Sequence, residues 1–468
     1  MALVLLCASA AGCASATSSS QRLAQGGDGT QPVDTTADAR PAGPTGADGA
    51  PTSGSASDAA AADGAPFDTT TEPIADAKVT RPDTAVGPSP DAVVGPPPAP
   101  DAAPPECAPP APPAEVRVGG GFAGKPQCGP LSWFAVAPVG MRLHLSARGV
   151  PPGVTLAVTD PTGAQLATER ADDRGVVSVH VTPLQSGELR WTFETSPDSP
   201  PGRLSGSLIC EAGCDLEATR YPIVLLHGMG GTDRYFGLLE YFYQVTEQLG
   251  GRGFATFTPV VPIIGSSDVR AAALAPQIDA ILAQTGAAKV HLIAHSQGGL
   301  DVRVLVSGLG YADRVASVTT ISAPHRGIPF DLPEWLSGQD FSRAGMEAFA
   351  LQYPDVDGMP SFSWAGHTCG LLEADCRAAH QDELVDPLLA PSHAALSAEA
   401  ADDGEGGAND GVVLVSSARW GVFLGELPAD HFDEVGQIAD AAPAPFDHRA
   451  FYLSEARRLR QLEIDRGL

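Results

Sequence analysis

The chain has 468 residues, among them 43 prolines and 52 glycines, and a formal net charge of −28. Two or three domains fit this length, but the prolines and glycines are unevenly spread, so the folded part is shorter than the whole. The acidity argues against a nucleic-acid partner and indicates a solvated, self-repelling chain.

Residues 1–13, MALVLLCASAAGC, combine an apolar run with small residues before Cys13. This pattern is typical of a bacterial lipoprotein signal, after whose cleavage the cysteine carries lipid and anchors the protein in a membrane. The positively charged start of such a signal is missing, so an ordinary apolar N-terminus is the alternative. The first interpretation predicts an exported cell-surface or outer-membrane lipoprotein; secreted and periplasmic locations are the alternatives. No later apolar run is long enough to span a bilayer.

Residues 14–106 consist mostly of Ala, Pro, Gly, Ser, Thr and Asp, with few large apolar side chains. Such a segment cannot bury enough apolar surface to offset the entropy lost on ordering, so we predict a disordered tether. Its proline density, as in VGPPPAPDAAPP, favours extended segments that hold the following domains away from an anchoring surface.

Six cysteines remain besides Cys7 and Cys13 of the N-terminal segment. An even number of cysteines in an exported protein predicts disulfide bonds. Four of them bracket residues 107–214 and two form a later local pair: Cys107, Cys128, Cys210, Cys214, Cys369 and Cys376. Zinc is the alternative for the group of four, but no histidine lies beside them in the spacing of a zinc site.

Residues 107–217 contain short segments in which apolar and polar residues alternate between Gly, Pro and Asp turns. This pattern predicts a small β-sandwich that includes RLHLSARG, VTLAVTDPTG, VVSVHVTPL, LRWTFETSP and GRLSGSLIC. His144 and His180 occur singly in these strands and are interpreted as packing or surface residues. No catalytic group is visible, so the domain is interpreted as a spacer or a binding module.

Residues 218–468 change to apolar strands that alternate with helical stretches, the pattern of an α/β domain with a mostly parallel sheet. The predicted strands are YPIVLLHG, GFATFTPVV, KVHLIAHS, VASVTTISAP and DGVVLVSS. Since ligands bind at the carboxyl ends of parallel strands, the loops HGMGG, HSQGG and SAPHRG are expected to meet at one edge of the sheet.

The most informative stretch is KVHLIAHSQGG, in which a buried strand ends at Ser296 and a helical pattern follows. A serine hydroxyl is a poor nucleophile until a strained strand-to-helix turn exposes it beside a base and directs it at backbone donors. The usual motif is G-x-S-x-G; here Ala294 replaces the first glycine, while Gly298 and Gly299 keep the far side open. Ser296 is therefore the predicted nucleophile of a nucleophile elbow.

In this fold the nucleophile is followed along the chain by an acid and then by a histidine. Two late histidines, His431 and His448, follow a strand-associated acid. His448 lies in PFDHRAFY, where a surface or helix N-terminal role is the better interpretation. His431 is therefore the predicted general base.

Six motifs resemble, in the same order, the bacterial triacylglycerol lipases of the Pseudomonas and Burkholderia type, which have the α/β-hydrolase fold. They are YPIVLLHGMGGTDRYFGLLEYFY, AKVHLIAHSQGGLDVR, VASVTTISAPHRG, SFSWAG, NDGVV and DHFDEVGQ, within residues 221–468. Six separated motifs in one order are far more specific than one motif alone. The resemblance implies a serine carboxylester hydrolase, in the first place a triacylglycerol lipase whose partner is a lipid or ester substrate.

The resemblance implies a catalytic triad of Ser296, His431 and Asp410, in which the aspartate of the NDG turn orients the imidazole. Asp402 and Asp403 are rival acids. They lie in AADDGEGG, for which a solvated loop is the simpler account.

Two backbone N–H groups, those of Gln297 and Met229, are expected to stabilise the oxyanion. The glycines that follow Met229 let its loop approach the substrate closely. His227 and His295 are interpreted as structural residues of the site rather than as the base.

The resemblance also implies a structural Ca²⁺ that holds the loop of the general base. Its ligands would be the carboxylates of Asp386 and Asp433 and backbone carbonyls near Gln437 and Ala441. Hard oxygen ligands suit calcium, although an acidic loop by itself is more simply a solvated face.

The sequence departs from the family at two places. Only residues 328–360 separate PHRG from SFSWAG, where the family has a long helical lid, so the lid is predicted to be reduced to the apolar lips FDLPEWL and MEAFALQY. A reduced lid argues against strong interfacial activation and makes a short-chain or polyester esterase the alternative. Ser416 replaces the family's cysteine after NDG, so Cys369 is expected to bond Cys376 instead. Dependence on a folding chaperone, known in the family, does not follow from this sequence.

A non-catalytic surface binding or adhesion protein is the alternative from another class. It would act through the β-domain and carry a broken triad. Every triad candidate is present in this chain, which argues against it.

Overall fold

In the computed structural model, the described residues are 112–125, 129–195, 203–235, 239–329, 332, 338–370, 384–400, 406–437 and 446–468. By their contacts these residues fall within one compact unit. The predicted signal and tether lie outside them, as do most of the FDLPEWL lip and the residues Cys107, Cys128, Cys376, Asp402, Asp403 and Ala441.

Two antiparallel-rich sheets form the N-terminal part of this unit, ordered β1-β3-β8-β5-β6 and β2-β9-β4-β7. The strands are β1 (Ala114–Glu115), β2 (Gly121–Gly124), β3 (Leu131–Ala137), β4 (Arg142–Arg148), β5 (Thr155–Thr159), β6 (Gln165–Arg170), β7 (Val176–Val181), β8 (Gly187–Glu194) and β9 (Leu204–Ala212). Every second residue is buried along β4 and β8, and the buried residues of both sheets share one core. The predicted β-sandwich is confirmed, and its five predicted segments are all strands.

The outward side of this sandwich carries the two histidines of the predicted strands. His144 and His180 face each other across β4 and β7 and stack with ring centroids 4.4 Å apart. At the end of β9, Cys210 and Cys214 form a disulfide. Cys369 is also disulfide-bonded.

A six-stranded sheet forms the core of the C-terminal part, in the order β13-β10-β14-β15-β16-β17. Every neighbouring pair in it is parallel. Its strands are β10 (Ile223–Leu226), β13 (Thr256–Phe257), β14 (Val290–His295), β15 (Val315–Ile321), β16 (Ser361–Gly366) and β17 (Val422–Leu427). Every residue of β10, β14 and β15 is buried, as expected for a parallel sheet with both faces covered.

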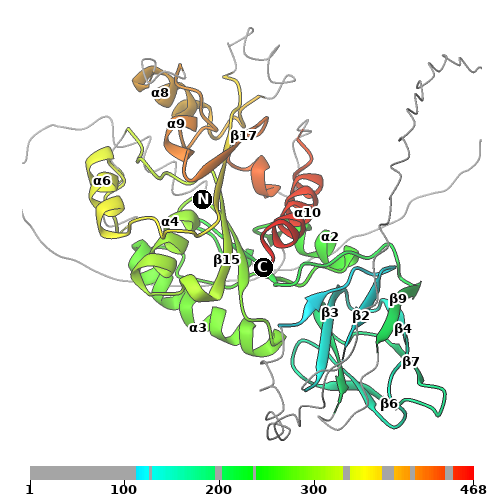
Figure 1. The fold of residues 1–468 in the computed structure, drawn as a ribbon. Helices are drawn as coiled ribbons and strands as arrows, with labels where there is room; N and C mark the ends of the chain where they lie inside the picture. Colours follow the sequence, from blue (N-terminus) through cyan, green and yellow to red (C-terminus); the bar gives the residue numbers. More distant parts are fainter. Residues whose placement is uncertain are drawn as a thin grey trace, which may run out of the picture. The chain divides into compact units, whose positions relative to one another are not determined.

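Helices cover the two faces of the sheet and create two cores. On one face, α3 (Ser267–Thr285) and α4 (Gly298–Arg303), which continues as the π-helix η1 (Val304–Gly308), pack on alternate residues of β10 and β14. On the other face, α2 (Val245–Arg252) and α10 (His448–Arg466) pack on the remaining residues of these strands. Figure 1 shows α10 beside α2 and α3 beside α4.

The remaining helices of the described residues lie in the connections before and after β15, after β16 and after β17. They are η2 (Ala312–Arg314), α6 (Arg343–Gln352), α8 (Ala390–Glu399), α9 (Val415–Ala418) and η3 (Asp433–Val435), and the short strands β11 (Arg234–Tyr235) and β12 (Leu239–Glu240) pair after β10. The lip MEAFALQY forms most of α6. Within the described part of the chain, no helix is long and apolar enough to cross a membrane.

One predicted strand is wrong: DGVVLVSS forms a turn followed by α9. The Asp410 carboxylate accepts the backbone N–H groups of Val412 and Val413, at 2.8 and 2.6 Å, which bends the chain out of an extended conformation. The sheet is completed instead by β16 and β17.

Candidate active site

Ser296 lies on a strained turn between β14 and α4, as the motif predicts. Its φ is +57°, a left-handed conformation that costs a non-glycine residue about 1–2 kcal/mol. The turn is tight: a Cβ on Gly298 would lie 2.9 Å from the carbonyl oxygens of Leu226 and His227, and one on Gly299 would lie 2.4 Å from Ala323 Cβ. The small residues after the serine are therefore required by the packing.

Asp410 and His431 form a buried pair that matches the acid and base of a triad. Nδ1 of His431 lies 2.7 Å from Oδ2 of Asp410, and both side chains are fully buried. Burial alone would raise the pKa of Asp410, but His431 and the two backbone N–H donors hold it below its usual value. The carboxylate therefore stays ionised and keeps the imidazole proton on Nδ1.

The second nitrogen of His431 is available at the elbow. Its Nε2 is buried and has no hydrogen-bond partner among the described residues. The imidazole lies 4.4 Å, centroid to centroid, from the ring of His295, the residue before Ser296. The structure thus brings His431 to the nucleophile turn, with the lone pair of a base unused.

His448, the rival base, begins α10 and lies elsewhere. Its Nε2 bonds the carbonyl oxygen of Tyr243 at 2.9 Å, and Asp447 caps the helix through Ala450 N–H. This is the helix N-terminal role expected from the sequence. The rival acids lie outside the described residues.

The loop after β10 passes directly over Ser296. A Cβ on Gly228 would lie 2.6 Å from Ser296 Cβ and 3.1 Å from its Oγ, so only glycine fits there. Among the described residues, neither the Met229 nor the Gln297 N–H donates to another backbone group. Both N–H groups are free to meet a developing oxyanion.

A buried arginine, which sequence reasoning missed, holds the carbonyl side of this loop. Nη2 of Arg270 donates to the carbonyl oxygens of His227 and Gly228 at 2.7 and 3.2 Å, and Nε donates to Asp301 Oδ2 at 2.7 Å. Because the C=O and the following N–H of a trans peptide point in opposite directions, fixing the Gly228 carbonyl also fixes the Met229 N–H. An arginine directly before the apolar run AAALAP was the available signal.

His227 supports the same peptide, in the structural role expected for it. Burial and the nearby Arg270 lower the pKa of His227 to about 4, so the ring is neutral at pH 7. Its Nδ1 lies 2.9 Å from Gly228 O and its Nε2 lies 3.3 Å from Val261 N, which assigns the proton to Nδ1.

A family model described as the alpha/beta hydrolase fold matches residues 221–358. This part of the chain has the α/β-hydrolase fold. The parallel sheet and the serine turn at its carboxyl edge agree with this assignment.

Relatives of this α/β hydrolase include a triacylglycerol lipase of Pseudomonas fragi, 28% identical over 52% of this chain and 97% of that protein. A triacylglycerol lipase of Burkholderia plantarii is 40% identical over 24% of this chain. The match spans about a third (32%) of that protein. A solved Staphylococcus hyicus lipase covers 55% of this chain and 99% of its own, with 16% identity and a TM-score of 0.42. The sequence relatives and the α/β-hydrolase fold support a serine ester hydrolase.

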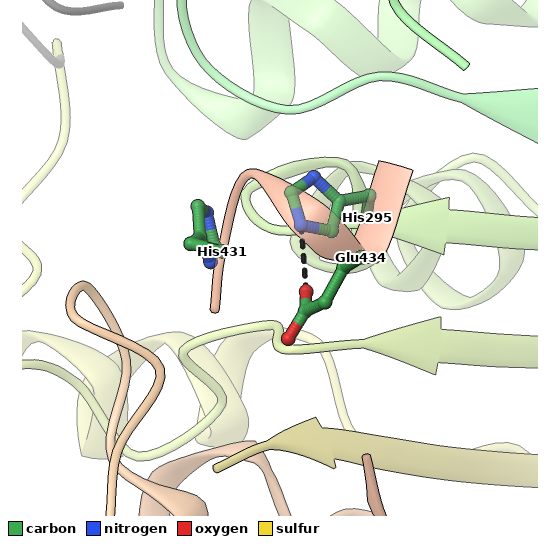
Figure 2. A group of neighbouring side chains, drawn as sticks. All are labelled: His295, His431 and Glu434. Atoms are coloured by element: carbon green, nitrogen blue, oxygen red, sulfur yellow. Dashed lines mark hydrogen bonds and ion pairs between the residues drawn. The ribbon is translucent and has the colours of Figure 1, made fainter. Parts of the chain in front are cut away.

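His431 of the Asp410–His431 pair also belongs to a second buried cluster, with His295 and Glu434, whose ligand-type atoms lie within 4.8 Å of one another. Figure 2 shows the bond from His295 Nε2 to Glu434, 2.8 Å long. Tyr241 and Asp410 bond the Nδ1 atoms of His295 and His431, so a cation would have to bind the two Nε2 atoms and displace the proton shared by His295 and Glu434. The cluster is better described as a hydrogen-bonded neighbour of the Asp410–His431 pair.

Sequence reasoning missed Glu434 as a member of the site. It is fully buried, and burial together with the negative charge of Asp410 raises its pKa well above the usual range. Its position three residues after His431, in DHFDEVGQ, was the only signal available.

The predicted calcium ligands of this α/β hydrolase flank one buried carboxylate. Asp430 accepts the N–H of Asp386 at 2.7 Å and the N–H groups of Phe432 and Asp433 at 2.8 and 2.9 Å. The loop of Asp386 is thus held against the turn that carries His431. Carboxylate and carbonyl oxygens are donors that fit calcium, although within the described residues these aspartates do not form a group of three at metal-ligand spacing.

Proposed function

We propose that the protein is an exported lipase that hydrolyses acylglycerol esters through an acyl-enzyme on Ser296. The observation that carries this proposal is the Asp410–His431 pair, 2.7 Å apart, beside a strained serine turn. His431 keeps an unused Nε2 at this turn. This set of groups is the one that serine ester hydrolysis requires.

In the proposed reaction, His431 Nε2 accepts the hydroxyl proton as Ser296 Oγ attacks the ester carbonyl. Ionised Asp410 stabilises the imidazolium that forms, because its pKa is held low. The oxyanion is held by the N–H groups of Met229 and Gln297, each worth about 3 kcal/mol in comparable sites. His431 then returns the proton to the leaving alcohol, and a water molecule activated by the same nitrogen releases the acid from Ser296.

An apolar rim beside the oxyanion loop favours a lipid substrate. Val260, Ile263 and Ile264 are 42, 52 and 46% exposed, high values for large apolar side chains. Their segment is tied to the site, because Gly230 N–H donates to Ile263 O and Gln297 Nε2 donates to Gly265 O, both at 2.8 Å. Clustered exposed apolar groups indicate contact with an apolar partner, here acyl chains at a lipid surface.

A short-chain or polyester esterase is the second candidate. The observation that favours it is the short stretch between β15 and β16, in which α6 is the one helix among the described residues. A small lid leaves the site open to soluble esters without activation by an interface. Rates on p-nitrophenyl acetate, butyrate and palmitate and on emulsified triolein separate the two, since a lipase prefers the palmitate and the emulsion.

The decisive experiment compares the wild type with Ser296→Ala on these substrates. We expect a loss of about 10⁴-fold or more in kcat, because the remaining groups give only residual catalysis. A fluorophosphonate probe should label the wild type and not the variant. Equal rates, or no labelling of the wild type, would favour a non-catalytic binding protein instead.

We also propose a structural calcium ion held by Asp386, Asp433 and carbonyl groups near Gln437 and Ala441. Bound there, the ion supplies a positive charge that keeps the turn of His431 in place. The bonds of Asp430 to both segments support this placement.

The further proposal for location is a lipid anchor on Cys13, which lies before the predicted tether. Labelling with radioactive palmitate in a bacterial host should mark the wild type, and Cys13→Ser should release unlabelled protein from the membrane fraction. Labelling of both proteins equally would contradict the anchor.

A further inference from the structure

A line of buried hydrogen bonds runs from the oxyanion loop, residues 227–231, to the histidine loop, residues 430–437. Gly228 N–H donates to the hydroxyl of Tyr241 at 3.1 Å, and this hydroxyl lies 2.7 Å from Nδ1 of His295. Nε2 of His295 lies 2.8 Å from Glu434 Oε2, the dashed bond of Figure 2. Tyr241, His295 and Glu434 are 1, 0 and 0% exposed.

The protons of this line can be placed in one consistent direction. The Tyr241 oxygen accepts from Gly228, so its own proton is given to Nδ1 of His295. Burial, and then the neighbouring His431, hold the pKa of His295 well below its usual value, so the ring is neutral and carries its single proton on Nε2. That proton is donated to Glu434, so the Tyr241 hydroxyl and both nitrogens of His295 have partners.

The line ends beside the triad acid. Ser322 Oγ, which accepts Gly366 N–H at 2.9 Å, donates to Glu434 Oε1. A Cβ on Gly366 would lie 2.0 Å from Glu434 Oε1 and 2.8 Å from Asp410 Cβ. The carboxyl of Glu434 and the side chain of Asp410 therefore both pack into the space left at Gly366, the end of β16.

We propose that Tyr241, His295 and Glu434 are positioning residues that hold the oxyanion loop in register with the histidine loop. The proposal rests on the function proposed for Met229 and His431. These two residues come from distant parts of the chain. Their relative placement decides whether the Met229 N–H can stabilise the oxyanion while His431 accepts the proton. Arg270 fixes the carbonyl side of the Gly228 peptides, and Tyr241 fixes the N–H side.

The first test is Tyr241→Phe, which keeps the ring and removes the hydroxyl shared by Gly228 and His295. We expect kcat on p-nitrophenyl butyrate to fall about tenfold with KM changed less than about twofold, because the loss concerns the transition state. Affinity for an alkyl boronic acid, which forms a tetrahedral adduct with the serine, should fall by a similar factor. Tyr243→Phe is the matched control, because its hydroxyl bonds only the Gln244 side chain among the described residues.

The second test asks whether the far end of the line acts on the near end. Hydrogen–deuterium exchange of the peptide that covers residues 226–232 should be faster in Glu434→Ala than in the wild type, although among the described residues Glu434 bonds His295 and Ser322 and not that loop. Glu434→Gln, which can still accept from His295, should restore most of the protection. The double variant Tyr241→Phe/Glu434→Gln should have a kcat no lower than the poorer single variant, since both break one line.

These measurements distinguish the proposed link, the positioning of the oxyanion loop by Tyr241, His295 and Glu434, from the proposed function. A wild type without esterase activity overturns the function, while the exchange experiment still decides the link. Equal kcat in Tyr241→Phe and Tyr243→Phe, with unchanged exchange of residues 226–232 in Glu434→Ala, would overturn the link. Lower thermal stability with strictly additive kinetic losses would also overturn it, because that result shows a structural role alone.

Discussion

Nη2 of Arg270 lies 2.7 Å from the carbonyl oxygen of His227, so a fully buried cation holds the loop that carries the expected Met229 donor. The charge of Arg270 is matched by Asp301, which is also fully buried. A buried ion pair by itself is weak evidence for stability. Here the arginine has a second use, because its guanidinium orients two peptide planes beside the nucleophile.

Arg270→Met should therefore lower both stability and activity. Removing one partner leaves Asp301 as an unpaired buried charge, which costs about 3–5 kcal/mol of the free energy of unfolding. Arg270→Met/Asp301→Leu should recover most of this stability and little of kcat, because nothing then orients the Gly228 peptide. Urea unfolding and p-nitrophenyl butyrate hydrolysis measure the two effects; full recovery of kcat in the double variant would contradict the positioning by Arg270.

Asp410→Asn should lower kcat about 10⁴-fold while the melting temperature changes little, because the amide no longer selects the Nδ1–H tautomer of His431. Asp402→Asn and Asp403→Asn serve as controls for the rival acids and should retain wild-type kcat. A large loss of kcat in either control, with activity retained in Asp410→Asn, would assign the role of the triad acid to Asp402 or Asp403.

His227 should make the protein less stable in mild acid. Its pKa is about 4 in the folded protein and about 6.5 in the unfolded chain, so the unfolded chain binds more protons between these values. The neutral ring contributes roughly 3 kcal/mol to the free energy of unfolding above a pH of about 6.5. This contribution is lost as the pH falls towards 4. Melting curves across this window measure the slope, and His227→Gln should flatten it; an unchanged slope would assign the acid sensitivity to other groups.

Chelation of calcium should lower the melting temperature. An ion at 100 times its Kd stabilises the folded state by about 2.7 kcal/mol, and EDTA removes this contribution. Added Ca²⁺ should restore it, whereas Mg²⁺ should not, since the donors come from loops rather than an octahedral cage. Asp386→Asn should already have the lower melting temperature and respond weakly to EDTA. The same EDTA shift in Asp386→Asn and the wild type would place the ion elsewhere.

Much of the fold follows from local pattern. Period-two alternation predicted the sandwich strands, and short runs rich in apolar and β-branched residues predicted β10, β14 and β15, because burial on one or both faces favours such residues. The pattern failed at DGVVLVSS, where an apolar run resembles a strand but the Asp410 carboxylate turns the chain. A side-chain bond to the backbone leaves no mark on hydrophobic periodicity.

The sequence by itself determined the chemistry of the nucleophile turn, because the elbow needs small residues around Ser296 at fixed spacing. It also placed His431 late in the chain, through the order of acid and base. Only the tertiary structure decided which buried polar groups meet: Tyr241 and His295 are 54 positions apart, and His295 and Glu434 are 139 apart. Such partners are chosen by the order of strands in the sheet and by the need to satisfy every buried polar atom, and neither requirement can be read from neighbouring residues.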